Sequence, residues 1–460
     1  MTKKDYGEGP ILAMVERMRH ESVDAEWMRG PRHTVTCYGP GYYWAILAAA
    51  KPMGDLQQTL IPGRLVSLAA ALAIAAMIAA VVARRTESVP LGLFCALLFL
   101  SWRVVEFWVP FHRTDVLSVV FSFAAYVAAS RDDRRGLLLA ALLIGVGSLV
   151  KQTVALSAMP IFLYYVLNRR YSDAAIFAMA VSAAGAVLWG AIDWASGGYF
   201  LTAAIRGNLN NPSLIQGLKL NFGFWVLCPA SLATIVVLVF MLATDVKRVL
   251  GSVFCVGFVV EVAIAMAAVF KEGAAINYFI PACALGATIV GVHGLSHFMT
   301  MSKQKTLIAV AVVSLLFTIG KFIEIPANFA VLRDFDAGYA NVEKALETSP
   351  SEWVLVDGGW TDAALAAGAK PMVNDPILLR LMEENGTVDS GPLRDAMSRG
   401  EIRYLVLNGT VEEHREQIGN HVQKWSADVI QAMEQHYHFA FTLDAKGDKI
   451  YIYRHRRTKD

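Results

Sequence analysis

The chain has 460 residues, of which 55% are hydrophobic and only 17% are charged. Its mean hydropathy is +0.45, and because soluble proteins carry about 25% charged residues, this composition indicates a membrane protein. The net charge of +2 is too small to argue for nucleic acid as a partner. The five cysteines show no CxxC or other ligand spacing, which argues against a disulfide framework or a zinc site.

The first 61 residues are polar and mixed in charge, and they precede every long apolar run. Glu8 stands between Gly7 and Gly9-Pro10, a setting in which we expect a carboxylate to be held in a turn just outside a bilayer. The plain alternative is a solvated loop acid. We interpret residues 1–61 as a first extracytoplasmic loop that carries the catalytic acid.

Apolar runs near the length of a membrane span fill residues 62–326. A spanning helix needs about 20 mostly apolar residues. Lys151 and Gln152 separate two short runs, which we expect to form a helical hairpin. The sequence predicts about ten spans, at 62–83, 89–108, 115–130, 136–151, 153–167, 173–195, 223–244, 249–270, 276–298 and 305–325.

Alternate connections between these spans carry paired basic residues, among them Arg84-Arg85, Arg134-Arg135 and Lys247-Arg248. The excess of lysine and arginine in short cytoplasmic loops assigns these connections to the cytoplasm. The first loop and the tail then lie outside, as in a multi-pass protein of the bacterial cytoplasmic (inner) membrane. Because nothing before Tyr6 could carry the N-terminus across, we expect that an upstream first helix is missing from this chain.

From about residue 327 the composition becomes that of a soluble protein. Short β-rich runs alternate with helical segments, which predicts a small extracytoplasmic α/β domain over residues 327–460. The predicted fold class is therefore mainly α, a polytopic membrane helical bundle with this domain at its C-terminus. The expected strands of the domain are 353–356, 404–407, 437–443 and 450–453, and its expected helices are 376–385, 391–399 and 411–434.

Charges beside apolar spans cost a few kcal/mol and need a reason. In the topology above, Arg113, Asp115, Lys151 and Lys271 come from different parts of the chain but share the outer face with Glu8. Carboxylates beside several cations suit the departure of a phosphate. One carboxylate can act as a general base, and the cations or a metal can stabilise charge on the leaving group.

Structural explanations stay open for several of these groups. Asp115 could pair with its arginine neighbour or cap the helix that begins there, and Lys271 could pair with Glu272 or with lipid headgroups. Lys151 has no acidic residue near it in the sequence, which favours a functional role. His112 lies in the same outer segment and is a further candidate.

A set of short motifs, met in a fixed order, carries a family resemblance. Over roughly residues 6–300 the chain resembles polytopic C-type glycosyltransferases, in the bacterial branch similar to dolichyl-phosphate-mannose protein mannosyltransferases and the aminoarabinose lipid A transferase. The motifs are Tyr6-Gly7-Glu8-Gly9 with Tyr38-Gly39-Pro40-Gly41-Tyr42-Tyr43, Gly63-Arg64-Leu65-Val66-Ser67, Arg113-Thr114-Asp115, Lys151-Gln152-Thr153, and the run from Lys271 to Phe279.

The resemblance implies a catalytic acid in the first outer loop, which falls on Glu8, and a second acid in the next outer loop, which falls on Asp115. It also implies basic residues around the phosphate of a lipid donor, for which Arg113, Lys151 and Lys271 are the candidates. The first loop has a single acid at the motif, not an adjacent acid pair, which argues against direct metal binding there. Further candidate site residues are Gln152, Asn277, Tyr278 and His112.

The implied reaction moves a sugar from a polyprenyl-phosphate-linked donor to an envelope acceptor, which could be a lipid, a polysaccharide or a protein, and inverts the anomeric centre. Membrane lipid is a further expected partner, and a divalent cation, Mg²⁺ or Mn²⁺, is left open as a cofactor. One alternative is a secondary transporter or flippase-like protein with an accessory domain, although the spans show no matching halves with broken helices. Another is a membrane sensor or assembly factor whose tail binds a partner.

Overall fold

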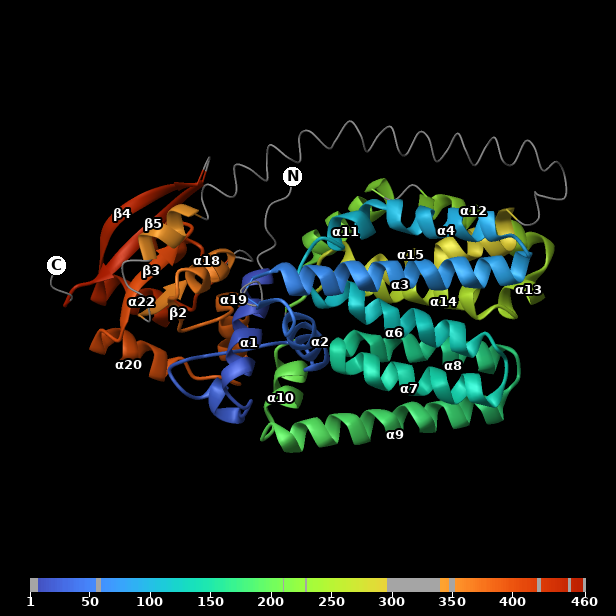
Figure 1. Cartoon of the computed structure of the whole chain (residues 1–460), viewed down its shortest axis with the longest axis horizontal. Coiled ribbons are helices and arrows are strands. Elements are labelled where there is room, and N and C mark those ends of the chain that lie inside the picture. Colours follow the sequence, from blue (N-terminus) through green and yellow to red (C-terminus); the bar gives the residue numbers. More distant parts are fainter. Residues whose placement is uncertain are drawn as a thin grey trace.

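The computed structural model describes residues 7–54, 59–209, 211–227, 230–295, 340–346, 352–419, 423–445 and 448–457. Helices dominate these residues, so the mainly α part of the predicted fold class is confirmed. A helical bundle fills one end of the molecule and a mixed helix–sheet part fills the other (Figure 1). The predicted span at 305–325 and the expected domain boundary near residue 327 lie outside the described residues.

The bundle is built from apolar helices that pack their small and aromatic residues inward. Phe99, Trp102, Phe123 and Phe279 are fully buried in its core. Within the described residues, three helical segments are long and apolar enough to cross a membrane, so the number of spans stays a prediction. The bundle helices are α3 Ile61–Thr86, α4 Val89–Ser101, α5 Arg103–Trp108, α6 Thr114–Ala129, α7 Arg134–Val150, α8 Ala158–Leu167, α9 Tyr171–Ala195, α11 Leu214–Leu227, α12 Ala230–Thr244, α13 Val246–Leu250, α14 Val253–Ala268 and α15 Ile280–Ile289.

The first polar stretch, residues 7–54, contains regular structure, and the expectation that Glu8 sits in a turn is wrong. Glu8 is the first residue of helix α1 (Glu8–His20), which is followed by a 3-10 turn and by α2 (Gly41–Ala50). The acid at the start of α1 and the basic Arg17 and Arg19 in its last turn both complement the helix dipole. Pro10 is tolerated because it lies in the first turn, where its missing N–H costs no helical hydrogen bond.

The tail forms a five-stranded sheet in the order β2-β1-β3-β5-β4. The pairs of β1 with β2 and with β3 are parallel, whereas β5 pairs antiparallel with β3 and β4. The predicted strands are present, and a short edge strand, β2, was not predicted. The elements are β1 Trp353–Val356, α18 Thr361–Ala366, β2 Lys370–Pro371, α19 Pro376–Glu384, α20 Gly391–Arg399, β3 Ile402–Leu407, α21 Val411–Glu416, α22 Ala427–His436, β4 Tyr437–Ala445 and β5 Asp448–His455.

The single helix expected at 411–434 is wrong, because the chain forms two helices, α21 and α22, in this region. The reason lies in Trp425 and Lys424, which precede α22. The Trp425 Nε1 donates to Asp357 Oδ1 at 2.9 Å, and the Lys424 ammonium donates to Asp357 Oδ2 at 2.8 Å. Asp357 is fully buried at the end of β1, so satisfying this carboxylate requires the chain to turn inward here.

The first polar stretch and the tail share one hydrophobic core. Met14, Trp27 and Tyr42 belong to the same buried cluster as Leu405 and Trp425 of the tail. The contact is close at Gly9, where a Cβ atom would lie 2.7 Å from the Gly358 carbonyl oxygen, so only glycine fits without a shift. Residues 7–50 and the described residues of the tail from 352 onward therefore form one packed unit at the end of the bundle.

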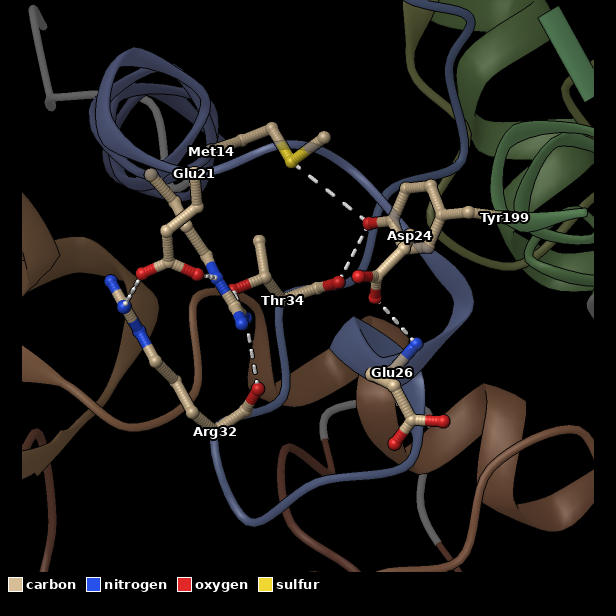
Figure 2. Close-up of polar contacts among 8 residues, drawn as sticks. Met14, Glu21, Asp24, Glu26, Arg32, Thr34 and Tyr199 are labelled. Atoms are coloured by element: carbon tan, nitrogen blue, oxygen red, sulfur yellow. Dashed lines mark hydrogen bonds and ion pairs between the residues drawn. The ribbon is translucent and has the colours of Figure 1, made fainter. Parts of the chain in front are cut away.

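Polar contacts fix the loop that follows α1 (Figure 2). Arg17 donates to the Arg32 carbonyl at 3.0 Å and to Thr34 Oγ1 at 2.8 Å, and both arginines contact Glu21. Tyr199, the first residue of α10 (Tyr199–Arg206), donates its hydroxyl to the Thr34 carbonyl at 2.6 Å. This hydrogen bond attaches the loop after α1 to α10, the helix that follows α9.

Candidate active site

A buried ion pair joins two of the predicted site residues, Asp115 and Lys151. The Lys151 Nζ donates to Asp115 Oδ1 at 2.5 Å, and the same oxygen accepts the Asn277 Nδ2 at 2.6 Å. Asp115 is 2% exposed and Lys151 is 6% exposed. Segments far apart in the sequence, the start of α6, the end of α7 and the chain before α15, therefore meet at one carboxylate.

The second oxygen of Asp115 is differently placed. Its Oδ2 is buried and accepts no hydrogen bond within the described part of the chain, and the Arg113 Nε lies 3.8 Å from it. The Arg113 guanidinium also stands 5.6 Å from the ring of Trp108. Two cations thus face one carboxylate, which leaves this cluster with a net positive charge and one buried carboxylate oxygen that accepts no hydrogen bond from the described residues.

Lys151 reaches this position because the chain breaks its helix there. Helix α7 ends at Val150, Lys151 takes an extended conformation, and a 3-10 helix continues from Gln152 to Ser157. The Lys151 ammonium lies 4.7 Å from the centre of the Tyr278 ring. The aromatic face compensates part of the cost of burying this charge.

A cavity of about 320 Å³ opens beside this cluster. Five of the predicted site residues line it: Arg113, Lys151, Lys271, Asn277 and Tyr278. Other polar and aromatic residues also line the cavity, among them Tyr38, Trp108, Asn208, Glu272 and Asp375.

Lys271 lies on the wall of the cavity and donates its Nζ to Asn208 Oδ1 at 2.5 Å. Partial burial lowers the pKa of Lys271, and the nearby Lys151 charge lowers it further, while Cys37 acts in the opposite direction. Lys271, Lys151 and Arg113 thus give the cavity three basic side chains. Such a set is suited to a phosphate group.

The tail closes another side of the cavity. Asp375 accepts the backbone N–H of Leu378 at 3.0 Å and so caps α19, and both residues line the cavity. Arg380 of the same helix forms an ion pair at 3.1 Å with Glu272, the residue after Lys271. The site is therefore built jointly by the bundle and the tail.

Glu8 lies outside the set of lining residues, although its neighbour Gly7 belongs to it. The Glu8 carboxylate is fully buried and accepts the Arg64 Nε at 2.9 Å, the Arg64 Nη2 at 3.0 Å and the backbone N–H of His112 at 2.8 Å. Three donors thus occupy this carboxylate. Its contacts hold the start of α3 and the segment before α6 against α1.

The His112 ring is a packing group in this arrangement. It is fully buried, 5.8 Å from the ring of Tyr42. Burial lowers the pKa of His112 to about 3, and Arg64 and Arg113 add to the effect, so the ring is neutral at physiological pH. The His112 backbone N–H, which donates to Glu8, therefore contributes more to the structure of the site than the His112 imidazole does.

Gln152 does not line the cavity, but it positions residues that do. Its Nε2 donates to the Cys37 carbonyl at 2.8 Å, and the Asn208 Nδ2 donates to the same oxygen at 3.0 Å. Cys37 and Tyr38 of the first stretch are thereby held at the cavity wall. Gly39 follows, where a Cβ atom would collide with the Leu149 carbonyl, so the glycine of this motif permits the first stretch to approach α7.

Some residues of the site carried little signal in the sequence. Asp375 followed by Pro376 is a helix-start pattern, and it predicts a cap rather than a cavity wall. Asn208 and Arg380 stand in ordinary polar contexts. Arg64 is part of the motif that opens the first span, but its pairing with Glu8 depends on a contact between segments 56 residues apart.

The described residues do not fit a bound divalent cation. Within them, no group of three or more histidine, cysteine, aspartate or glutamate side chains converges. Glu272 is paired with Arg380, Asp375 caps a helix, and Asp115 faces Lys151 and Arg113. The positive charge in the cavity comes from its basic side chains, Arg113, Lys151 and Lys271.

Comparison with known proteins identifies the fold. No family model matches the chain, and no curated protein matches it in sequence. The structure is similar to ArnT from Cupriavidus metallidurans bound to undecaprenyl phosphate, with a TM-score of 0.66 and 11% identity over 98% of this chain and 94% of that chain. It is also similar to the apo state of the same ArnT, with a TM-score of 0.65 and 12% identity over 98% and 93% of the two chains.

ArnT is the aminoarabinose lipid A transferase, a glycosyltransferase with the GT-C fold. The likeness covers the bundle and the tail together, and it confirms the resemblance expected from the sequence motifs at the level of the fold.

Proposed function

We propose that the chain is a membrane glycosyltransferase that takes a sugar from a polyprenyl-phosphate-linked donor. The observation that carries this proposal is the cavity that Arg113, Lys151 and Lys271 line beside the buried Asp115. The shared fold supports it, because the ArnT neighbour was solved with undecaprenyl phosphate bound. We further propose that the chain lies in the bacterial inner membrane and acts at its outer face on a lipid, polysaccharide or protein of the envelope.

The three basic side chains bind the donor phosphate in this proposal. Lys271 and Arg113 are partly exposed and can move toward a ligand, whereas Lys151 is held by Asp115. As the bond between the anomeric carbon and the phosphate oxygen breaks, negative charge grows on the phosphate. Cations held close to the phosphate stabilise that charge and so lower the barrier.

The acceptor hydroxyl or amine attacks the opposite face of the anomeric carbon, which inverts it, and its proton passes to a carboxylate. Glu8 and Asp115 are the two candidates. Asp115 Oδ2 accepts no hydrogen bond from the described residues, whereas three N–H groups occupy the Glu8 carboxylate. Neither carboxylate lines the cavity, but Asp115 lies directly behind two residues that do, Arg113 and Lys151. We therefore favour Asp115 as the acceptor of the proton, with Glu8 positioning Arg64 and the segment before α6.

Binding of undecaprenyl phosphate tests the proposal directly. The full chain, purified in a neutral detergent, is titrated with undecaprenyl phosphate and followed by native mass spectrometry. We expect Lys271→Ala to weaken binding about tenfold or more, because a charge-assisted contact to phosphate is lost. The matched control is Lys219→Ala, since Lys219 is an exposed lysine of α11 that does not line the cavity.

Equal weakening in both variants, or none in Lys271→Ala, would contradict a phosphate site in this cavity. The transfer reaction needs a second experiment, mass analysis of envelope glycans from cells with and without the gene. A sugar substituent that disappears with the gene and returns with the wild-type chain names the donor sugar and the acceptor together. Unchanged glycans in that experiment would contradict the transferase assignment.

A further inference from the structure

A second cavity, of about 300 Å³, lies at the opposite end of the bundle from the candidate active site. Its walls come from the end of α3, the turn between α6 and α7, the start of α14 and the segment after α15. Figure 1 shows α13, which leads into α14, at the end of the bundle far from the sheet. None of the residues discussed for the candidate active site lines this cavity.

Two arginines from distant parts of the chain face this cavity, Arg85 and Arg248. Arg85 is anchored, because its Nη2 donates to the Ser130 carbonyl at 3.0 Å. Arg248 is the third residue of α13 and is exposed. The two residues are 163 positions apart in the sequence, from 85 to 248, but the fold brings them to one cavity. Both guanidinium groups can therefore contact the same anion.

Asp132 also lies in this cavity, but it does not neutralise the positive charge of the two arginines. Its carboxylate is paired with Arg170 and accepts the Tyr164 hydroxyl at 3.3 Å. Arg170 also pairs with Asp173 at 2.8 Å, so it compensates Asp132 only in part. Even with Asp132 counted as one negative charge, the two arginines Arg85 and Arg248 leave the cavity walls with a surplus of positive charge.

The remaining walls combine hydrogen-bond donors with apolar surface. Helix α14 begins at Val253 after its cap, Ser252, so the first N–H groups of this 16-residue helix lie at the cavity wall. The Ser252 hydroxyl is also 3.3 Å from His293 Nε2. Phe254 and Val292 supply apolar wall next to these polar groups.

We infer that this cavity binds the phosphate headgroup of an acidic phospholipid. Arginine pairs and helix N-termini recognise phosphate oxygens, and basic cavities between membrane helices are typical sites for anionic lipid headgroups. The apolar wall favours a lipid over free phosphate, because the first carbons of a glycerol backbone and acyl chains need a surface of that kind. The position at the end of apolar helices puts the cavity where headgroups lie.

The test uses the full chain in neutral detergent micelles and phosphatidylglycerol as the probe, with adducts counted by native mass spectrometry. We expect Arg85→Gln with Arg248→Gln to weaken the first phosphatidylglycerol adduct about 100-fold, because two charge-assisted contacts are lost. The matched control changes their neighbours, Arg84→Gln with Lys247→Gln. These two side chains are also exposed and carry the same charge, but they do not line the cavity.

The control pair should change the affinity less than threefold. Equal losses in the two double variants would show a general attraction to a basic surface and would overturn the proposal. Two further binding measurements test which ligand the cavity takes. Phosphatidylcholine should bind much more weakly than phosphatidylglycerol, and inorganic phosphate at the same concentration should not displace the lipid. Displacement by phosphate would show a free-phosphate site instead.

Arg248→Gln alone provides a variant with little risk of misfolding, since the Arg248 side chain is exposed. Its expected weakening of phosphatidylglycerol binding is about tenfold. This readout does not depend on the proposed transferase activity, because undecaprenyl phosphate binding at the other end of the bundle should be unchanged in the same variant. No change in phosphatidylglycerol binding would exclude Arg248 from a headgroup site.

Discussion

Asn374 of the tail holds Val35 of the first polar stretch by two hydrogen bonds, one in each direction. The Val35 N–H donates to Asn374 Oδ1 at 2.7 Å, and the Asn374 Nδ2 donates to the Val35 carbonyl at 2.8 Å. The two residues are 339 positions apart and both are buried. The side chain of Asn374 thus completes the backbone pairing that begins at the parallel bridge between His33 and Val373.

Replacing Asn374 by alanine should loosen the tail from the first stretch. The Val35 N–H and carbonyl would be left buried without partners, at a cost of about 1–3 kcal/mol each. We expect a clear fall in the melting temperature of the purified chain. Asn385→Ala is the control, because the Asn385 amide makes an exposed hydrogen bond to the Arg206 carbonyl. Equal effects of the two substitutions would contradict the special role of Asn374.

Acid should weaken the same contact through His33. Burial lowers the pKa of His33 to about 4, an effect that the nearby Met28 backbone only partly offsets. An unfolded histidine has a pKa of about 6.5, so the unfolded chain binds the proton more tightly, and folding stability falls as the pH drops from about 6.5 to 4. For this group alone the loss is about 2 kcal/mol at pH 5 relative to pH 7.5.

His33→Gln removes the titrating group and should reduce the difference in melting temperature between pH 7.5 and pH 5.0. His438→Gln, at an exposed position of the tail, is the control. If wild-type and His33→Gln proteins lose the same stability on acidification, His33 does not control the acid response.

Much of the architecture could be predicted from the sequence because its signals are local. Apolar runs marked the bundle, and the strand at 353–356 and helices near 376–385 and 391–399 were found from periodicity and turn residues. The helix at 411–434 was predicted wrongly, because the pattern contains no sign of the buried Asp357 that draws Trp425 inward.

The candidate site could be predicted only in part. Arg113, Lys151 and Lys271 stood out because charges beside apolar runs are costly, and they line one cavity. The contribution of Asp375 could not be predicted, because it depends on the tail folding against the first stretch. Glu8 stood out for its glycine and proline neighbours, but its partner Arg64 follows from tertiary structure.

Asp115 and Glu8 should differ in how they affect sugar transfer. Asp115→Asn should lower transfer by about 10²–10⁴-fold, the range of a general acid–base contribution. Glu8→Gln should also lower transfer, and a smaller loss than in Asp115→Asn is expected if Glu8 acts through Arg64. Transfer is measured from a polyprenyl-phosphate sugar at saturating donor. Wild-type activity in a well-folded Asp115→Asn variant would remove Asp115 from the mechanism.

Folding must be controlled in that comparison, because breaking a buried ion pair costs about 3–5 kcal/mol. The double variant Asp115→Asn with Lys151→Gln removes both charges. We expect it to recover much of the melting temperature lost in Asp115→Asn while remaining inactive. Recovery of both stability and transfer in the double variant would indicate that the ion pair has only a structural role.

Binding of the donor phosphate should weaken at alkaline pH because of Lys271. Burial lowers the pKa of Lys271 from its usual value, so the side chain loses its charge at a lower pH than a solvated lysine does. Phosphate monoesters are fully ionised above a pKa of about 6, so between pH 8 and 10 the ligand charge stays constant. Affinity for undecaprenyl phosphate should therefore fall across this range.

Lys271→Arg should flatten that profile, because arginine stays charged at these pH values. Its affinity at pH 8 can be lower, since arginine and lysine differ in shape, and the informative quantity is the slope between pH 8 and 10. The same slope in wild-type and Lys271→Arg proteins would show that another group controls the alkaline loss.

The core shared by the two ends of the chain also sets an order for biosynthesis. Trp27 and Met14 are made early, but their partners Leu405 and Trp425 emerge from the ribosome only after the whole bundle has been synthesised. At about 5–20 residues per second, the 339 residues between Val35 and Asn374 represent a delay of about 20–70 s. During that interval the apolar side of α1 has no tail to cover it, so this stretch stays exposed to aggregation until the tail has been synthesised.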